Sequence, residues 1–310
     1  MPSLPVTDTL VPFLSCLITF ADIFGFALEY PGDEIVLKTA KKKGVVITRI
    51  TGDNGKLPFE PEKNTATIPI LHFLEHLNSK TGFEIEIHKK MPLGSGLGSS
   101  AASAVAGVFG VNILLGEPVE RSELMSFAIK GEEAVSGSVH YDNIGPALLG
   151  GFVIIRSSEP LDIIKIRTPE NLFCTVVHPH VEIRTEYARS ILKKEIPLAD
   201  GVKQWGNVAG LVTGLLTSDY KLIGRSVEDF VAEPVRAELI PGYFSVKERA
   251  LKEGALGVNV SGSGPSVFAL ADSKERAFSV GEVMKKAFNE KGLNCDLYVS
   301  RINDKGVKII

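Results

Sequence analysis

A glycine-rich loop between a strand and a helix is the feature that most constrains this sequence. Its residues are, in order, Pro92-Leu93-Gly94-Ser95-Gly96-Leu97-Gly98-Ser99-Ser100-Ala101-Ala102. Apolar and polar residues alternate over 82–89, which predicts a half-buried strand before the loop, and small residues from Ser99 to Leu115 predict a helix after it. Glycines at alternate positions let the backbone adopt positive φ and approach a ligand, while the free N–H groups of a helix start favour an anion. The sequence therefore predicts a cradle for phosphate.

This loop differs from two common phosphate loops. The Walker pattern ends in Gly-Lys-Ser/Thr, and no lysine is present here. The dinucleotide-binding fingerprint spaces its glycines G-x-G-x-x-G after the first strand of a fold, whereas these are spaced G-x-G-x-G and several elements precede them. A flexible Gly/Ser linker is the plain alternative, but a linker would not run directly into a long apolar helix. We therefore expect a phosphate cradle of another kind.

The composition is that of a globular protein with a core of its own. The chain has 310 residues, of which 44% are hydrophobic, enough for one large domain or two ordinary ones. Its net charge is −3 and its lysines and arginines are scattered, so we expect no nucleic acid as a partner and no anionic membrane surface. The cysteines Cys16, Cys174 and Cys295 form no C-x-x-C pair, which argues against a disulfide framework or a structural zinc and favours a reducing, cytoplasmic location.

Two stretches with few charges, 11–28 and 97–116, could be mistaken for membrane segments. The first lacks the basic residues that precede the apolar part of a signal peptide, because the first lysine or arginine is Lys38. The second is long enough to span a bilayer, but it is rich in Gly, Ser and Ala. We expect no membrane segment.

Strands and helices are mixed along the chain without a strict βαβ repeat, which favours the α+β class. Hydrophobic alternation and short apolar runs predict strands over 33–39, 44–51, 82–89, 152–156, 172–177, 256–260, 266–271 and 295–301. Helical spacing predicts helices over 65–79, 99–115, 120–135, 142–149 and 274–290, with further helices between the strand at 172–177 and about residue 253. Thr168-Pro169-Glu170-Asn171 is typical of a junction between two parts.

The loop resembles the phosphate-binding motif of the GHMP kinases, Pro-x-x-x-Gly-Leu-Gly-Ser-Ser-Ala. A second string, Val260-Ser261-Gly262-Ser263-Gly264-Pro265-Ser266-Val267-Phe268, resembles the C-terminal glycine-rich motif that packs beside that loop. Three further strings, at 137–152, 183–189 and 233–242, are similar to those of the family members that phosphorylate homoserine. The resemblance runs from about residue 22 to the end of the chain.

The resemblance implies a fold and a reaction. It implies an α+β, two-domain GHMP kinase fold, with residues 1–165 resembling ribosomal protein S5 domain 2, residues 166–310 ferredoxin-like, and the active site between them. It implies ATP-dependent phosphorylation of the side-chain hydroxyl of L-homoserine to O-phospho-L-homoserine, a step of threonine biosynthesis, with Mg²⁺ as a cofactor. Both a monomer and a homodimer are compatible with it.

The resemblance also implies roles for individual residues. Residues 92–102 would bind ATP, and Glu132 and Ser100 would hold Mg²⁺. Asn143 would orient the reacting hydroxyl or phosphate. Glu132 and Asn143 are therefore the expected catalytic residues. Five residues would line the substrate pocket: Asp22, His140, Thr185, Arg189 and Arg236. Their chemistry suits homoserine, because a guanidinium of Arg189 or Arg236 can bind its carboxylate and Asp22 can bind its ammonium. Whether Asp22 binds the amino group or takes the hydroxyl proton stays open.

The first 21 residues depart from the family pattern. Family members begin with a strand, an Ala-Asn pair and then Gly-Phe-Asp-x-x-Gly, whereas here Cys16 takes the place of the Asn and Phe20 that of the Gly. Three prolines also argue against a central strand: Pro2, Pro5 and Pro12. A shifted reading frame, a mistaken start or true divergence would each explain this. Two alternatives for the function therefore stay open: another small-alcohol kinase of the same family, or a nucleotide-binding homologue with impaired catalysis.

Overall fold

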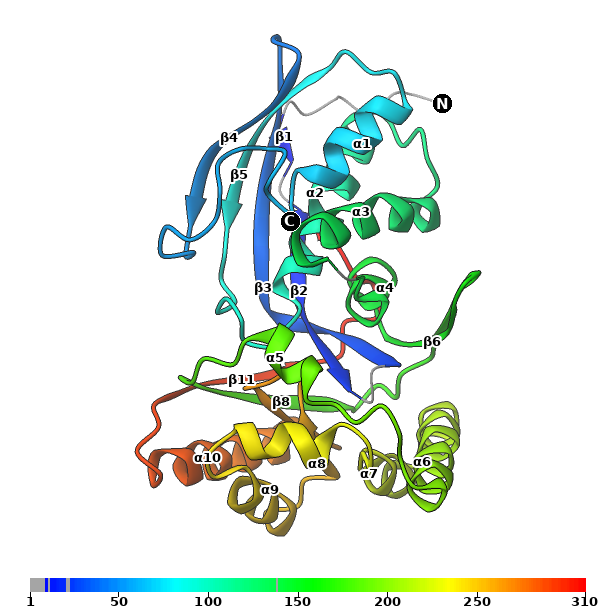
Figure 1. Cartoon of the computed structure of the whole chain (residues 1–310), viewed down its shortest axis with the longest axis vertical. Helices are drawn as coiled ribbons and strands as arrows, with labels where there is room; N and C mark the ends of the chain where they lie inside the picture. The colour runs from blue at the N-terminus through cyan, green and yellow to red at the C-terminus, as the bar shows by residue number, and fades with distance from the viewer. Residues whose placement is uncertain (1–8, 11, 21–22, 138) are drawn as a thin grey trace.

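Two β-sheets organise the chain, the larger one above the smaller one in the view of Figure 1. The computed structural model describes residues 9–10, 12–20, 23–137 and 139–310, with side chains from residue 23 onward except that of Ser136. The larger sheet has eight strands in the order β12-β2-β3-β5-β4, with β1 and β6 also paired to β3, and β7 paired to β6. These strands are β1 (Thr9–Leu10), β2 (Pro12–Phe20), β3 (Phe24–Ala40), β4 (Gly44–Thr51), β5 (Gly82–His88), β6 (Phe152–Ser158), β7 (Leu161–Ile166) and β12 (Lys308–Ile309).

Four helices cover one face of the larger sheet (Figure 1). They are α1 (Ile68–His76), α2 (Ser99–Leu114), α3 (Leu124–Ser136) and α4 (Tyr141–Leu149), with a 3₁₀ turn, η1 (Arg121–Glu123), before α3. The alanine-rich α2 is buried along almost its whole length because its small side chains let the sheet and the other helices approach closely. This burial fixes the start of α2, and with it the end of the glycine-rich loop.

The smaller sheet has four antiparallel strands in the order β11-β8-β10-β9. These are β8 (Phe173–Pro179), β9 (Gly257–Val260), β10 (Val267–Ala271) and β11 (Cys295–Arg301). Its helices and 3₁₀ turn are α5 (Thr185–Ser190), α6 (Leu198–Thr217), α7 (Tyr220–Ser226), α8 (Glu233–Arg236), η2 (Ala237–Leu239), α9 (Tyr243–Lys252) and α10 (Lys274–Asn289). The chain order and the strand order are those of a ferredoxin-like sheet with extra helices between β8 and β9, as predicted.

Strand β3 belongs to the larger sheet but also contacts the smaller one. Its pairing with β2 is interrupted between Ala27 and Gly32, and in this interval Leu28 bridges to Ile302 while the Tyr30 N–H donates to Ser300 Oγ at 3.0 Å. Nearby, Phe26 stacks on Phe152 of β6 at 4.4 Å between ring centroids and meets Phe268 of β10 edge-on at 5.7 Å. The two sheets therefore share one hydrophobic core, which holds their facing elements in place.

The expectation that the N-terminal residues form no central strand is wrong. Strand β2 runs from Pro12 to Phe20 and pairs with β3 on one side and with β12 on the other. Pro12 is the first residue of the strand, where a missing N–H disrupts the ladder least. Pro2, Pro5 and the side chain of Cys16 lie outside the described part of the chain.

The end of the chain returns to the larger sheet. Strand β12 pairs with β2, and the Arg121 guanidinium donates to the carbonyl oxygens of Leu148, Lys305 and Val307 at 2.6–2.9 Å. Strand β7 ends at Ile166, close to the boundary expected between residues 165 and 166. That boundary stays a prediction. Residues 303–309 follow the strands of the smaller sheet in sequence, yet they pack on the larger sheet and supply its strand β12.

Most other elements form where the sequence predicted them. Strands β4, β5, β8, β9, β10 and β11 and helices α2, α4 and α10 match within two residues. Helix α1 is shorter than the expected 65–79, because Asn64 and Thr67 form hydrogen-bonded turns before it, and β3 is longer than the expected 33–39. Strands β1 and β12 were not predicted, since two residues carry no periodicity of their own, and the six-residue strand β7 was also missed.

No helix within the described part of the chain combines the length and apolarity needed to cross a membrane.

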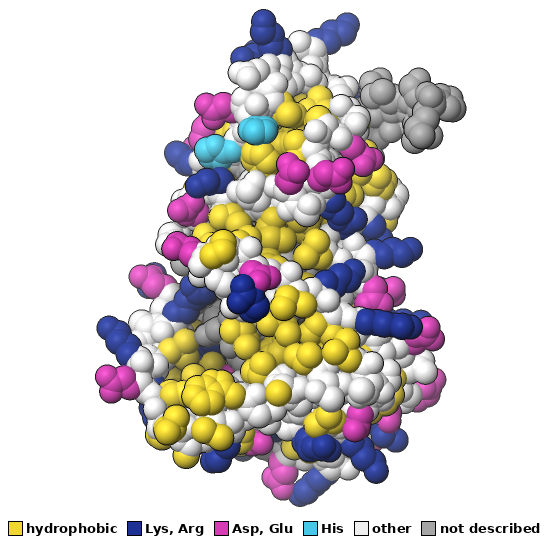
Figure 2. Space-filling view, turned by 90° about the vertical axis from the view of Figure 1, so that its right-hand side faces the viewer, with side chains coloured by type: hydrophobic (Ala, Val, Ile, Leu, Met, Phe, Trp, Pro, Cys, Tyr) yellow, Lys and Arg dark blue, Asp and Glu magenta, His cyan; other side chains and the backbone are white. Residues whose placement is uncertain are grey.

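Exposed apolar side chains gather on one face, as Figure 2 shows for the side of the molecule where α6 lies in Figure 1. On α6 they include Leu198, Val202, Trp205 and Leu216. The homodimer considered from the sequence stays a prediction, which analytical ultracentrifugation would test.

Candidate active site

A cavity of about 260 Å³ lies where the glycine-rich loop faces helices of both parts of the chain. It brings together most of the residues predicted for the site, namely 92–101, Glu132, His140, Asn143, Thr185, Arg189 and Arg236. Ala102 does not line it, because its side chain is fully buried within α2 and its N–H donates to the Gly98 carbonyl. Asp22 lies outside the described residues. The individual roles of these residues stay predictions.

The loop is shaped for an anion. Gly94, Gly96 and Gly98 have φ of 69°, 75° and 64°, the left-handed region that favours glycine. Within the described part of the chain, no other residue accepts a hydrogen bond from the backbone N–H groups of 96–101. These donors stand at the N-terminus of α2, whose dipole also favours negative charge, so the cradle fits the phosphates of a nucleotide.

The second glycine-rich string packs against the loop, as the resemblance implied. Ser261 Oγ donates to the Gly96 carbonyl at 2.7 Å, and the Ser266 N–H donates to the Ser95 carbonyl at 3.3 Å. The approach is close: a Cβ on Gly96 would lie 2.4 Å from the Ser261 carbonyl oxygen and 2.8 Å from that of Gly264. The turn after β9 therefore supports the loop from the side of the smaller sheet.

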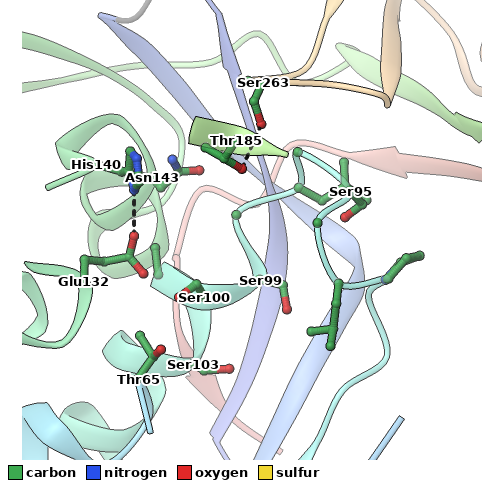
Figure 3. Close-up of a pocket in the computed structure, with 18 of the residues that line it drawn as sticks. Thr65, Ser95, Ser99, Ser100, Ser103, Glu132, His140, Asn143, Thr185 and Ser263 are labelled. Atoms are coloured by element: carbon green, nitrogen blue, oxygen red, sulfur yellow. Dashed lines mark hydrogen bonds and ion pairs between the residues drawn. The ribbon is translucent and has the colours of Figure 1, made fainter. Parts of the chain in front are cut away.

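An acidic group faces the start of α2. Glu132, on α3, is only 3% exposed, and its Oε2 lies 2.8 Å from His140 Nδ1 at the start of α4. Ser100, in the first turn of α2, lies beside this pair in Figure 3. Helix α4 packs closely against β3 at Gly25, where any side chain would clash: a Cβ on Gly25 would lie 1.8 Å from the Asp142 carbonyl oxygen.

The cavity also receives side chains from the smaller part of the chain. Thr185 begins α5, and its Oγ1 lies 3.3 Å from Ser263 Oγ in the turn after β9 (Figure 3). Arg189 follows one turn later on the same helix. Arg236, at the end of α8, is only 4% exposed. Two guanidinium groups therefore line the same cavity as the loop and Glu132.

Several lining residues were not found from the sequence. They include Leu57, Asn64, Thr65, Lys89, Ser103, Asp142 and Ser263. A lysine at the end of an alternating strand, directly before a phosphate loop, is a signal that could have identified Lys89. The others depend on turns and packing that no local pattern shows.

The described residues contain no group of three or more His, Cys, Asp or Glu side chains able to hold a metal ion. Glu132 and Ser100 supply one carboxylate and one hydroxyl, which are hard oxygen donors of the kind that Mg²⁺ takes together with phosphate oxygens and water. The donors fit a metal that arrives with a nucleotide better than one held by the protein alone.

Comparison with known proteins gives the family. Residues 64–151 match the model of the GHMP kinases N-terminal domain, and residues 211–290 match that of the GHMP kinases C-terminal region. A homoserine kinase of Chlorobium phaeovibrioides is 52% identical over 301 residues, covering 93% of this chain and 94% of that protein. The chain belongs to the homoserine kinase family of GHMP kinases. A homoserine kinase of Xylella fastidiosa is 35% identical over 289 residues, covering 93% of this chain and 89% of that protein.

Solved structures agree with this assignment. A crystal structure of homoserine kinase from Cytophaga hutchinsonii is 51% identical, matches with a TM-score of 0.97 and covers 100% of both chains. A mevalonate kinase of L. major is 16% identical with a TM-score of 0.72, covering 96% of each chain, and shows the shared fold alone. The predicted α+β GHMP kinase fold is confirmed.

Proposed function

We infer that this member of the homoserine kinase family transfers the γ-phosphoryl group of ATP to the side-chain hydroxyl of L-homoserine. The products are ADP and O-phospho-L-homoserine, a step on the way to threonine. The observation that carries this inference is a single cavity that joins a phosphate loop, an acidic group and two arginines. The relatives of about 50% identity, themselves homoserine kinases, support it.

The loop would act by positioning and by charge. Phosphoryl transfer passes through a loose transition state, so most of the rate comes from alignment and from stabilising charge on the phosphate oxygens. The N–H groups of 96–101 would bind those oxygens. Glu132 and Ser100 would hold Mg²⁺, which supplies further positive charge at the phosphates when bound.

The other side of the cavity would bind the amino acid. Homoserine is a zwitterion with a hydroxyl tail, and Arg189 or Arg236 would pair with its carboxylate. Asp22, outside the described residues, would bind the ammonium. His140, held by Glu132, and Asn143, on the first turn of α4, would orient the hydroxyl.

A coupled ADP-release assay tests the function. Homoserine, mevalonate, shikimate and galactose are each offered with Mg·ATP, and turnover is expected with homoserine. Turnover only with another alcohol would select a different substrate for the same fold. Nucleotide binding without turnover of any of the four would select a homologue with impaired catalysis.

A further inference from the structure

A buried ion pair lies directly beneath the phosphate loop. It joins Asp33 of β3, whose side chain is fully buried, to Lys89, whose side chain is 3% exposed and which follows β5. Burying two charges costs free energy that their attraction does not always return, so a pair of this kind is weak evidence of a contribution to stability. Its hydrogen bonds point instead to a role in setting geometry.

Asp33 connects the two ends of the loop. Its Oδ1 accepts from the N–H groups of Lys90, at 2.8 Å, and Met91, at 3.0 Å, where the chain enters the loop. Its Oδ2 accepts from Ser99 Oγ at 2.7 Å, where the chain leaves the loop and α2 begins. One carboxylate thus fixes the separation of the entry and the exit, between which the three left-handed glycines lie.

Lys89 fixes the rotation of α2. Besides the Asp33 carboxylate, its Nζ donates to the Ser99 carbonyl at 3.0 Å and to Ser103 Oγ at 2.8 Å. Ser99 and Ser103 are four residues apart and therefore share one face of the helix (Figure 3). With that face turned to Lys89, the first turn of α2 presents Ser100 to the side of Glu132.

We propose that Asp33 is a positioning residue for phosphoryl transfer, with Lys89 as its counter-ion. The pair sets the loop and the first turn of α2 so that the N–H groups of 96–101 and the Ser100 hydroxyl meet the phosphates in one arrangement. This rests on the proposed function, because it requires the loop to bind the phosphates of ATP. Misplacement of such donors by about 1 Å can lower a rate by roughly a hundredfold.

The decisive variants are Asp33→Asn, which removes the charge, and Ser99→Ala, which removes only the bond at the loop exit. Each is expected to raise KM for ATP and lower kcat by roughly tenfold or more, with KM for homoserine changed less than about threefold. Ser99→Thr keeps a hydroxyl and is expected to restore most of the activity. Displacement of a fluorescent nucleotide measures ATP affinity without any turnover.

The chain offers a matched control one residue along the same strand. Glu34 pairs with Lys90, the residue after Lys89, but this pair is solvent-accessible and does not touch the loop exit. Glu34→Gln is therefore expected to keep wild-type kinetics.

The outcomes separate the inference from the proposed function. Kinetics of Ser99→Ala like those of Glu34→Gln would overturn the positioning role, and this variant decides the matter if Asp33→Asn does not fold. The positioning role would also be overturned if a variant lost affinity for ATP and homoserine equally and had a lowered Tm. Such a result would mean that the substitution only destabilises the fold. Failure of the proposed function shows differently, because the unmodified protein itself would then turn over no homoserine.

Discussion

At the residue scale, burial decides what the charged groups can do. Arg236 is 4% exposed and lines the cavity, whereas Arg184, just before α5, has a side chain 79% exposed and only a surface contact with Glu186. A guanidinium shielded from water binds a carboxylate more strongly than an exposed one, because the solvent screens it less. The structure thus adds burial to the reason that the family resemblance gives for assigning Arg236, and not Arg184, to the substrate pocket.

Arg236→Ala is therefore expected to raise KM for homoserine and leave ATP affinity nearly unchanged. Loss of a shielded guanidinium–carboxylate pair costs about 2–5 kcal/mol. Steady-state kinetics with each substrate varied in turn measure the effect, and Arg184→Ala is the exposed control. A matched loss of affinity for ATP and homoserine would contradict the assignment of Arg236 to the amino acid.

A second residue-scale prediction concerns His178, on β8. Burial lowers the pKa of its imidazole to about 4, an effect that Asp296 partly opposes, and its Nδ1 lies 3.1 Å from Ser266 Oγ. Unfolding returns the pKa to about 6.5, so the unfolded chain binds more protons below that pH. The free energy of unfolding should therefore fall between about pH 6.5 and 4, by roughly 3 kcal/mol in total from this group.

Denaturant unfolding across this pH range measures the effect. His178→Asn, which keeps a hydrogen-bonding group near Ser266, should give a flatter profile than the wild type. Identical slopes for the wild type and His178→Asn would show that other groups cause the acid sensitivity.

At the element scale, the phosphate loop and the turn after β9 form one unit. The loop comes from the larger part of the chain and the turn from the smaller one, and they meet through Ser261 Oγ and the Gly96 carbonyl. No local sequence pattern predicts that these two segments pack together, because Ser261 and Gly96 are 165 residues apart in the chain. Through this contact the smaller part of the chain supports a loop that belongs to the larger part.

Gly96→Ala and Gly94→Ala separate backbone strain from this contact. Both glycines have φ near +70°, so alanine strains either by about 1 kcal/mol. Only at position 96 would the new Cβ meet the Ser261 and Gly264 backbone, since no atom lies within 4 Å of a Cβ at position 94. Nucleotide displacement should show a much larger loss of ATP affinity for Gly96→Ala, and equal losses would exclude a role for the contact.

At the scale of the whole molecule, the two ends of the chain complete the larger sheet together. Strand β12 pairs with β2, and Arg121 holds the segment before β12 by donating to the Lys305 and Val307 carbonyls. The guanidinium also lies 5.0 Å from the centroid of the Phe109 ring on α2. Burial lowers the pKa of Arg121, yet an arginine stays charged, so these hydrogen bonds are charge-assisted.

Arg121→Ala should lower the free energy of unfolding by about 2–4 kcal/mol, because three carbonyls lose a charged donor. Arg156→Ala, which removes an exposed pair with Asp162, should cost less than about 1 kcal/mol. Denaturant unfolding gives both values. Both KM values should stay at the wild-type level below the transition, and equal stability of the two variants would show that Arg121 does not anchor the tail.

The sequence by itself determined the parts whose causes are local. The alternation over 82–88, the small residues of α2 and the alternate glycines between them fixed a strand, a helix and a phosphate loop, because periodicity and left-handed backbone act within a few residues. Only the tertiary structure placed Asp33 and Lys89 beneath that loop and paired β2 with β12. Those contacts join residues far apart in the chain, and the packing of whole elements, not any local pattern, selects them.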